Sequence, residues 1–295
     1  MANRVALIGA GVMGSAIGTR LLETGNELHA FDLDKQKLAA LAAKGAKPAQ
    51  SAAAAAASAD FVITSLNSAK IVGAAIFGAE GVAAGAAPGT MIVDMSSIDP
   101  NSTRSLAVEA AAKGLRWLDC PLSGGAPKAL IGQLAVMAGG ERNDFEEARA
   151  VMRHLCANFT YMGPSGAGQT TKLINQVLCA LNFMAVAEAT QLALDAGVDA
   201  AAIPGALKGG RADSAILQEF MGKMARKDFS PTGRIDNMVK DLEGVQDLAR
   251  HTGTAMPLTS LCAEIHRLLT SAGLGGADNA ALMKFFEGPA KGDAA

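Results

Sequence analysis

The sequence predicts an α/β domain built on a mostly parallel sheet, followed by an all-α domain, with one long helix joining them. Short apolar runs alternate with helical segments as far as Gly163, which is typical of repeated strand-helix-strand units. Beyond Gly163 only helical periodicity is found. Between Gly168 and Gly197 there is neither Gly nor Pro, so this stretch predicts one helix of roughly 40 Å.

Size and charge narrow the class of protein. The chain has 295 residues, of which 50% are hydrophobic and 18% charged, which predicts two domains, residues 1–163 and 164–295. The net charge of -2 and the pI near 6.1 argue against a nucleic acid or an acidic membrane as partner. The uncharged piece Leu173–Ala187 is too short and too polar for a membrane span, and no signal-peptide core follows Arg4, so we expect a cytoplasmic protein.

Cysteine and histidine are too scattered to predict a metal site. The four cysteines lie far apart without a Cys-x-x-Cys pair, and no histidine stands at ligand spacing from them. The sequence therefore predicts free thiols and no bound metal.

The first strand is followed by a glycine motif. After the apolar run Val5–Ile8, the spacing G-x-G-x-x-G opens a helical segment. In this setting the first glycine permits a tight turn, the second lets the backbone approach a pyrophosphate, and the third lets helix and strand pack closely. The motif predicts a Rossmann-type dinucleotide site. Its candidate cofactor-binding residues are Gly9, Gly11, Val12, Met13 and Gly14.

A carboxylate at the end of the second strand indicates which dinucleotide is bound. The apolar run Leu28–Phe31 ends at Asp32, where a carboxylate accepts hydrogen bonds from the adenosine ribose hydroxyls. An NADP site is expected to carry an arginine nearby, but residues 33–35 offer only Lys35. The sequence thus favours NAD over NADP.

The alternation of helix and strand continues to the end of the first domain. In a doubly wound sheet, the carboxyl ends of the strands line the ligand crevice. Leu66 and Asn67 follow one strand and Ser97 follows the next, so we expect all three beside the ribose and nicotinamide. The predicted strands are Phe61–Ser65, Met91–Asp94, Leu115–Cys120, Gln133–Ala138 and Phe159–Met162, and the predicted helices are Lys35–Lys44, Ser51–Ala59, Pro100–Lys113 and Asp144–Leu155.

The strand ending at Cys120 leads into a run that suits a bound carboxylate. Ser123, Gly124 and Gly125 stand between two prolines, and their successive backbone N–H groups can form a concave anion site. The alternative is a flexible connector. A proline on each side favours a fixed turn.

The long helix carries a polar stripe. Lys172, Asn175, Cys179 and Asn182 recur at intervals of three, four and three residues, which places them on one helix face. A buried ammonium needs partners or a cavity that uses it. The alternative is a helix packed in a core or a dimer interface, with the lysine reaching solvent. Later helices are predicted at Ala200–Leu207, Ala212–Met224, Arg234–Arg250 and Leu258–Ala272.

Together these stretches resemble the beta-hydroxyacid dehydrogenase family over nearly the whole chain. Besides the glycine motif, the resemblance rests on segments 94–100 with Arg104, 119–125, 166–175 and 240–242. It implies that Lys172 is the catalytic lysine and that Ser97 and Lys240 reach the cofactor. It also implies a homodimer or homotetramer built around the long helix. The substrate-binding residues that it implies are Ser123, Gly124, Gly125 and Asn175.

The chemistry agrees with this resemblance. When a hydride leaves a carbinol carbon for the nicotinamide, one group must stabilise the developing alkoxide and exchange its proton, and a lysine can do both. We therefore expect an NAD-dependent oxidoreductase that interconverts a short 3-hydroxy acid and its semialdehyde, with a 3-hydroxyisobutyrate, glycerate/tartronate semialdehyde or threonate-like substrate. An imine reductase of similar architecture, which generally lacks this lysine, and a catalytically silent dinucleotide-binding module are the alternatives.

Several positions depart from the family's pattern and leave the substrate open. Gln176 stands where many members have Asn, Lys128 where Gly is common, and Asn67-Ser68 replaces a usual Pro-Asn. Arg234 follows Gly233, where an aromatic residue is frequent. Lys128, Arg211 and Arg234 either meet a second anionic or polyhydroxylated end of the substrate or are surface charges.

Overall fold

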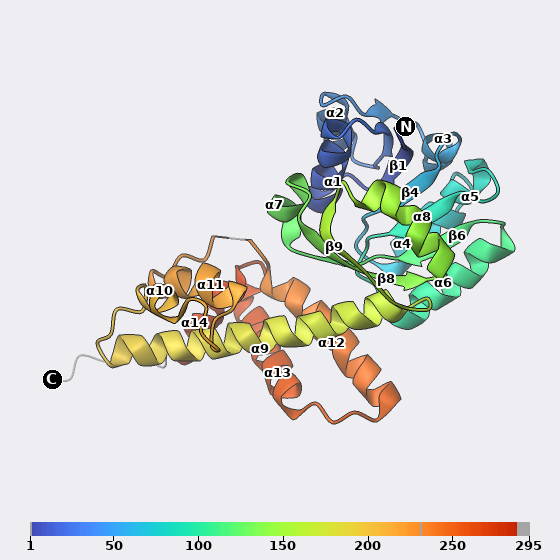
Figure 1. The fold of residues 1–295 in the computed structure, drawn as a ribbon. Coiled ribbons are helices and arrows are strands. Elements are labelled where there is room, and N and C mark those ends of the chain that lie inside the picture. The colour runs from blue at the N-terminus through green and yellow to red at the C-terminus, as the bar shows by residue number, and fades with distance from the viewer. Residues whose placement is uncertain (1, 231, 288–295) are drawn as a thin grey trace. The chain divides into compact units, whose positions relative to one another are not determined.

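The computed structural model describes residues 2–230 and 232–287 and divides the chain into two compact units. The division falls between Lys172 and Leu173, inside the long helix α9 (Ala167–Asp195). Figure 1 shows α9 as a single continuous helix. Its first six residues, Ala167–Lys172, belong to the first unit and its remainder to the second.

The first unit is built on a nine-stranded sheet. Six strands lie side by side in the order β3-β2-β1-β4-β5-β6, all parallel, which is the order of a doubly wound dinucleotide-binding sheet. Beyond them β8 runs antiparallel to β6, β7 is antiparallel to β8, and β9 is parallel to β8. The strands are β1 (Arg4–Ile8), β2 (Glu27–Phe31), β3 (Lys47–Pro48), β4 (Phe61–Thr64), β5 (Met91–Asp94), β6 (Arg116–Asp119), β7 (Leu122–Ser123), β8 (Leu134–Gly140) and β9 (Cys156–Gly163).

Each strand that the sequence predicts is present, and the two-residue strands β3 and β7 are additional. Three short helices, α4, α5 and α7, were also not predicted. A signal for α4 exists, because the hydroxyl of Ser68 caps it by accepting a hydrogen bond from the backbone N–H of Ile71 at 3.3 Å. The helices of this unit are α1 (Val12–Glu23), α2 (Lys35–Ala42), α3 (Ala52–Ala56), α4 (Ala69–Phe77), α5 (Val82–Gly85), α6 (Pro100–Ala112), α7 (Gly125–Leu130) and α8 (Arg142–Met152).

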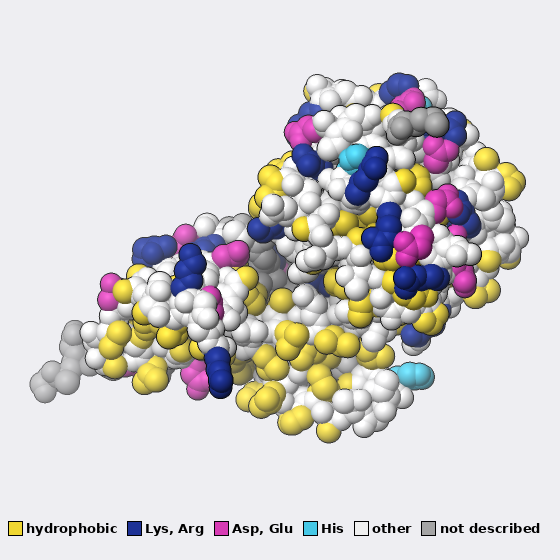
Figure 2. Space-filling view, viewed as in Figure 1, with side chains coloured by type: hydrophobic (Ala, Val, Ile, Leu, Met, Phe, Trp, Pro, Cys, Tyr) yellow, Lys and Arg dark blue, Asp and Glu magenta, His cyan; other side chains and the backbone are white. Residues whose placement is uncertain are grey.

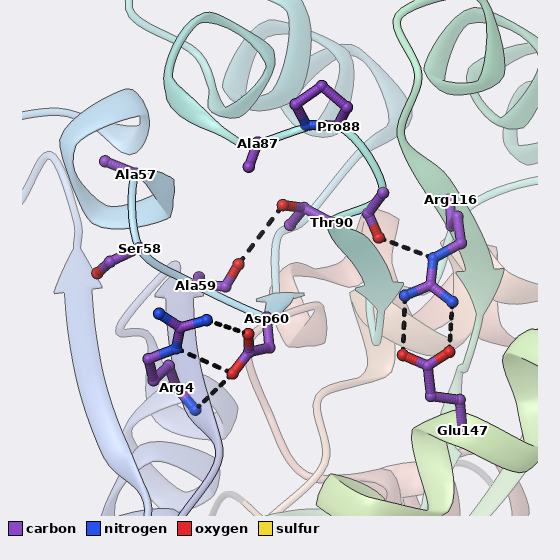
Figure 3. A pocket seen from close by; sticks show the side chains of 11 residues that line it. Arg4, Ala57, Ser58, Ala59, Asp60, Ala87, Pro88, Thr90, Arg116 and Glu147 are labelled. Atoms are coloured by element: carbon purple, nitrogen blue, oxygen red, sulfur yellow. Dashed lines mark hydrogen bonds and ion pairs between the residues drawn. The ribbon is translucent and has the colours of Figure 1, made fainter.

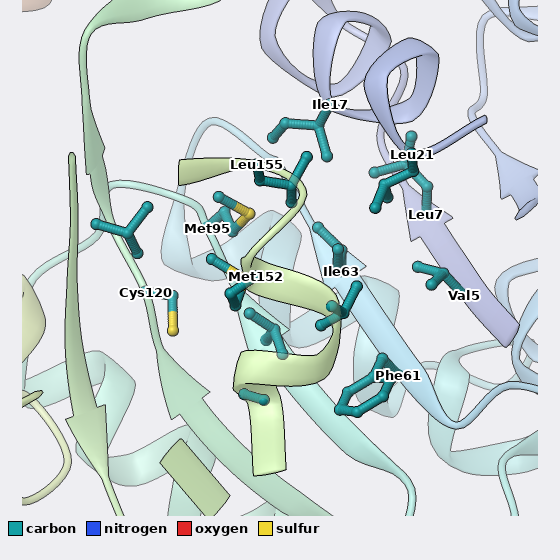
Figure 4. Packing of buried hydrophobic residues seen from close by; sticks show 14 of the residues in the cluster. Val5, Leu7, Ile17, Leu21, Phe61, Ile63, Met95, Cys120, Met152 and Leu155 are labelled. Atoms are coloured by element: carbon teal, nitrogen blue, oxygen red, sulfur yellow. The ribbon is translucent and has the colours of Figure 1, made fainter. Parts of the chain in front are cut away.

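The central strands are apolar on both faces because helices cover both sides of the sheet. On one face Leu7 and Ile63 pack with Ile17 and Leu21 of α1 and with Leu155, as Figure 4 shows. A separate cluster, which includes Trp117 and the helices α3 to α5, covers the other face. The polar ends of the strands are thereby held in fixed positions along one edge.

The second unit is all-helical, as the periodicity predicts. Its core joins the middle of α9, including Ala180, Phe183 and Ala187, to Met221 of α11 and Leu242 of α12. A π-helical turn (Thr270–Leu274) and a 3-10 turn (Asn279–Leu282) follow α13. The other helices are α10 (Ile203–Leu207), α11 (Ala215–Ala225), α12 (Ile235–Thr252), α13 (Pro257–Leu269) and α14 (Met283–Phe286).

By length and composition alone α9 could cross a membrane, since an 18-residue window of it has a mean hydropathy of 1.6. Sequence reasoning took the uncharged piece Leu173–Ala187 as too short and too polar for a span, whereas the whole helix passes this test of length and composition. One face of it packs in the core of its unit, where Ala180 and Ala187 are fully buried among other helices, and a third of that 18-residue window is buried. A polar side chain, Gln176, is also buried on it.

Candidate active site

The glycine motif forms the turn between β1 and α1 that the sequence predicts. Gly9 has a φ of +100°, and a Cβ there would lie 2.5 Å from the carbonyl oxygen of Ser65. A Cβ on Gly14 would lie 1.9 Å from the carbonyl oxygen of Gly9, so neither position accepts a side chain. A Cβ on Gly11 would meet nothing within 4 Å. The backbone at Gly11 therefore faces open space at a helix N-terminus, which fits a pyrophosphate. Val12 and Met13 form the first turn of α1.

Asp32 is attached to this turn. One of its carboxylate oxygens accepts a hydrogen bond from the backbone N–H of Ala10 at 2.6 Å, and the other accepts one from Asp34 at 2.7 Å. Each oxygen keeps a second lone pair for a ribose hydroxyl. The acceptor for the ribose and the turn for the pyrophosphate are thus one rigid piece. These residues fit a dinucleotide.

The ends of β4 and β5 are tied together beside this turn. The hydroxyl of Ser96 accepts a hydrogen bond from the backbone N–H of Leu66 at 3.0 Å. Asp94 Oδ1 accepts hydrogen bonds from the hydroxyl of Thr64 at 2.7 Å and from the backbone N–H of Ser96 at 3.0 Å. Leu66 also approaches Gly9, whose Cβ would lie 2.9 Å from Leu66 Cδ2. The candidate cofactor residues Leu66, Asn67 and Ser97 therefore follow strand ends that are held together.

Asp94 is fully buried, and its second oxygen, Oδ2, has no hydrogen-bond partner within the described residues. Burial raises the pKa of Asp94 to about 6, because a desolvated carboxylate favours its neutral form. Sequence reasoning assigned no role to this residue. Its position at the end of β5 next to two polar groups is the available signal.

Because Asp94 is buried with a raised pKa, we expect the stability of the first unit to depend on pH. Its pKa is raised above the ordinary value of 3.8, so the native state binds more protons than the unfolded chain between these values, and stability falls as pH rises through this window. Above pH 6, ionisation of the buried Asp94 lowers the free energy of unfolding by at most about 3 kcal/mol. We expect Asp94→Asn to remove most of this slope. Urea unfolding between pH 4 and 7, followed by the fluorescence of the single Trp117, measures it; a pH-independent difference between the two proteins would contradict the prediction.

The predicted carboxylate site is the junction of β7 and α7. Ser123 ends β7, and Gly124 and Gly125 have φ values of +120° and +70°. Both conformations are left-handed and strain any other residue, so glycine suits both positions of this turn. A Cβ on Gly124 would lie 2.9 Å from Cβ of Lys128. The stem of Lys128 therefore covers Gly124.

The first turn of α9 is anchored to the ends of the strands. Asp119, at the end of β6, accepts hydrogen bonds from the backbone N–H groups of Gly166 at 2.8 Å and Gln169 at 2.9 Å. Burial raises the pKa of Asp119, while these N–H groups act in the opposite sense. A Cβ on Gly168 would lie 2.5 Å from the carbonyl oxygen of Met137, so only glycine allows this approach. Lys172 lies one turn later, half-buried.

Asn175 and Lys240 belong to the second unit and are joined there by two further polar residues. Asn175 Nδ2 donates to Gln176 Oε1 at 2.8 Å, and Gln176 Nε2 donates to Asp241 Oδ2 at 2.5 Å. Asp241 Oδ1 lies 3.4 Å from the ammonium of Lys240. Gln176, a departure from the family's pattern, thus connects α9 to α12. Sequence reasoning assigned no role to Asp241.

Among the described residues we also looked for a metal-binding cluster and for a cavity lined by unpaired charges. The four cysteines are free thiols, and no three metal-binding side chains converge among residues 2–230 and 232–287. A cavity of about 270 Å³ lies at the opposite, amino-terminal edge of the sheet, near Arg4 and Arg116. Figure 3 shows that both arginines are engaged, Arg4 by Asp60 and Arg116 by Glu147. The arginine charges of this cavity are therefore compensated internally.

Comparison with known protein families accounts for both units. Residues 4–163 match the family described as the NAD-binding domain of 6-phosphogluconate dehydrogenase. Residues 166–286 match the family described as the NAD-binding domain of NADP-dependent 3-hydroxyisobutyrate dehydrogenase. L-threonate dehydrogenase of Cupriavidus necator is 32% identical over 289 residues, which cover 98% of this chain and 97% of the relative. The chain belongs to the beta-hydroxyacid dehydrogenase family.

Other members of this family act on different small acids. The NAD-dependent L-serine dehydrogenase of Pseudomonas aeruginosa is 33% identical over 292 residues, covering 97% of this chain and 98% of the relative. The 3-hydroxyisobutyrate dehydrogenase of Mycobacterium tuberculosis, solved with L-serine, superposes with a TM-score of 0.88 at 29% identity, covering 97% of this chain and 99% of that one. This member of the beta-hydroxyacid dehydrogenase family is thus an NAD(P)-dependent oxidoreductase with a Rossmann-type domain.

Proposed function

We propose that this protein is a cytoplasmic NAD-dependent dehydrogenase that interconverts a short 3-hydroxy acid and its semialdehyde, with Lys172 as the catalytic residue. The observation that carries the proposal is the anchoring of the first turn of α9 to Asp119. Lys172 follows one turn later on a helix whose start is fixed at the carboxyl edge of the sheet, where the dinucleotide motif also lies. A surface lysine would need no such anchoring.

Each residue has a separate task in this mechanism. Bound NAD would accept the hydride that leaves the carbinol carbon. In the oxidation direction, the neutral amine of Lys172 takes the hydroxyl proton as the carbonyl forms, and in reduction its ammonium returns that proton. Backbone N–H groups at Ser123, Gly124 and Gly125 hold the carboxylate and thereby orient the reacting carbon. Asn175, one turn after Lys172 on the same helix face, contacts the substrate.

The cofactor is assigned to NAD from Asp32 and its surroundings. An NADP 2′-phosphate would be placed against a carboxylate that its two backbone hydrogen bonds hold in position. Lys240 would reach the cofactor from α12. Its ion pair with Asp241 supports this role, because the pair and Gln176 give the lysine a defined position.

The substrate is proposed from the position of Lys128. Of the three basic residues that the sequence left open, Arg234 pairs with Asp236 in the second unit, and Arg211 is exposed there. Lys128 instead packs on Gly124 of the proposed carboxylate site. Its ammonium would meet hydroxyl groups of an acid longer than 3-hydroxyisobutyrate, and the L-threonate dehydrogenase among the relatives supports this class.

A substrate panel tests the function. Oxidation of threonate, glycerate, L-serine and 3-hydroxyisobutyrate is followed with NAD, and reduction of the matching carbonyl compounds and of a cyclic imine with NADH. We expect turnover of at least one hydroxy acid and a loss in kcat/KM of about 100-fold for its methyl ester, which removes a charged contact. Lys128→Ala should lower kcat/KM for threonate about 10-fold more than for 3-hydroxyisobutyrate. Reduction of the imine without turnover of any acid would refute the proposal.

We also propose that the protein is a homodimer or homotetramer. Large apolar side chains are exposed along α9, at Ile174, Leu178 and Leu192, and along α13, at Leu258 and Leu261. Hydrophobic atoms accordingly gather over the region of these helices in Figure 2. A monomer rarely exposes such a surface, and light scattering at micromolar protein would detect a monomer if the proposal is wrong.

A further inference from the structure

The side chain of Gln169 holds the backbone on both sides of Ser97. Its Nε2 donates to the carbonyl oxygen of Ser96 at 2.8 Å, and its Oε1 accepts from the backbone N–H of Ile98 at 3.2 Å. Gln169 is 1% exposed, so water cannot replace either bond. A carboxamide is required, because a carboxylate cannot donate and an apolar side chain would leave two buried backbone groups unpaired.

The bonds of Gln169 extend to the neighbouring strand ends. Its own backbone N–H donates to Asp119 Oδ2 at 2.9 Å, which fixes the residue to the end of β6. Through Ser96 it is connected to Asp94 at the end of β5 and to Leu66 after β4. One residue of α9 is therefore joined to the ends of β4 and β5, from which the candidate cofactor residues Leu66, Asn67 and Ser97 follow, and to the end of β6, which leads to the proposed carboxylate site.

Lys172 comes three residues after Gln169, and residues at this spacing share a helix face. A shift or rotation of the first turn of α9 would therefore move the lysine relative to Ser97 and Leu66. We propose that Gln169 is a positioning residue that sets the register of Lys172 against the loops that hold the nicotinamide half of the cofactor. This inference rests on the proposed function. The residue acts through the backbone of Ser96 and Ile98.

The decisive variant is Gln169→Glu, which keeps the shape and makes one hydrogen bond depend on a proton. As a carboxylate it can accept from Ile98 but cannot donate to Ser96, whereas the protonated form can do both. Asp119 of β6 and Asp94 of β5 are the acidic groups nearest to it along these bonds, and Lys172 follows on α9. We expect kcat to fall about 10- to 100-fold at pH 8 and to recover towards pH 6, since a small misplacement of a catalytic group has effects of this size.

Thr171→Ala is the matched control. Its hydroxyl donates a hydrogen bond to the carbonyl oxygen of Ala167, one turn back on the same helix, at 2.8 Å, so this variant should keep the pH profile of the parent. Trp117 fluorescence checks that each variant folds. In the parent protein, hydrogen exchange at the Ile98 amide should be slow, and rapid exchange there would overturn the inference even if every Gln169 variant unfolds. An unchanged pH profile in Gln169→Glu would overturn it as well.

Methylamine separates this inference from the proposed function. Added amine should restore part of the turnover of Lys172→Ala, in which the amine is missing, but none in Gln169→Ala, in which the amine is present but displaced. If Lys172→Ala alone retains full turnover, the proposed function fails. If Lys172→Ala is inactive and Gln169→Glu behaves like the parent, only the positioning role fails.

Discussion

Lys172→Ala is expected to lower kcat by about 10³-fold, within the range for loss of a general acid-base group. The dinucleotide turn and Asp32 lie on other elements of the first unit, so the Kd for NAD should barely change. Stopped-flow measurement of NADH formation gives the rate of the chemical step, and fluorescence titration gives the Kd.

Two further variants test whether the loss comes from proton exchange by Lys172 and not from the removal of any lysine. Lys172→Arg keeps a positive charge but cannot release its proton near neutral pH, so it should remain nearly inactive if proton exchange matters. Lys113→Ala removes an exposed lysine at the end of α6 and should behave like the parent protein. Retained turnover in Lys172→Ala would refute the catalytic assignment.

Asp32→Ala is expected to weaken NAD binding about 10- to 100-fold, since hydrogen bonds to a charged acceptor contribute about 1.5 to 3 kcal/mol. NADP should be affected much less, because the same substitution removes the charge that repels its 2′-phosphate. The ratio of the two Kd values, measured by titration calorimetry, reports this change. Asp32 is also the acceptor for Ala10 in the glycine turn, so a modest loss for both cofactors is expected in addition.

Asp34→Ala is the control for this loop. Asp34 caps α2 by accepting hydrogen bonds from Gln36 and Lys37, and its removal changes the net charge equally without removing the ribose acceptor. It should leave the preference for NAD intact. Equal losses of both cofactors in Asp32→Ala would show that Asp32 does not discriminate between them.

The parts that sequence reasoning predicted are those with local physical causes. Gly9 and Gly14 are required by contacts within one strand-turn-helix unit, and Asp32 follows the next strand directly. The long helix α9 needs only good helix formers without a breaker. The seven longer strands are apolar runs between turn residues, so their positions were predictable.

The residues that were missed have partners far away in the chain. Gln169 bonds to Ser96 across 73 positions and Asp119 bonds to Gly166 across 47, and no local pattern marks either pair. The short strands β3 and β7 are each two residues long and exist only because a neighbouring strand offers hydrogen-bond partners. The link from Gln176 to Asp241 likewise spans 65 positions of the chain.

By itself the sequence determined the order of the longer strands and most helices, the dinucleotide turn and the family to which the chain belongs, because spacing, capping and periodicity act over a few residues. The tertiary structure alone decided how the start of α9 is held. Buried polar groups must find hydrogen-bond partners wherever the fold brings them, and the ends of parallel strands brought Asp94, Asp119 and Gln169 together from distant positions.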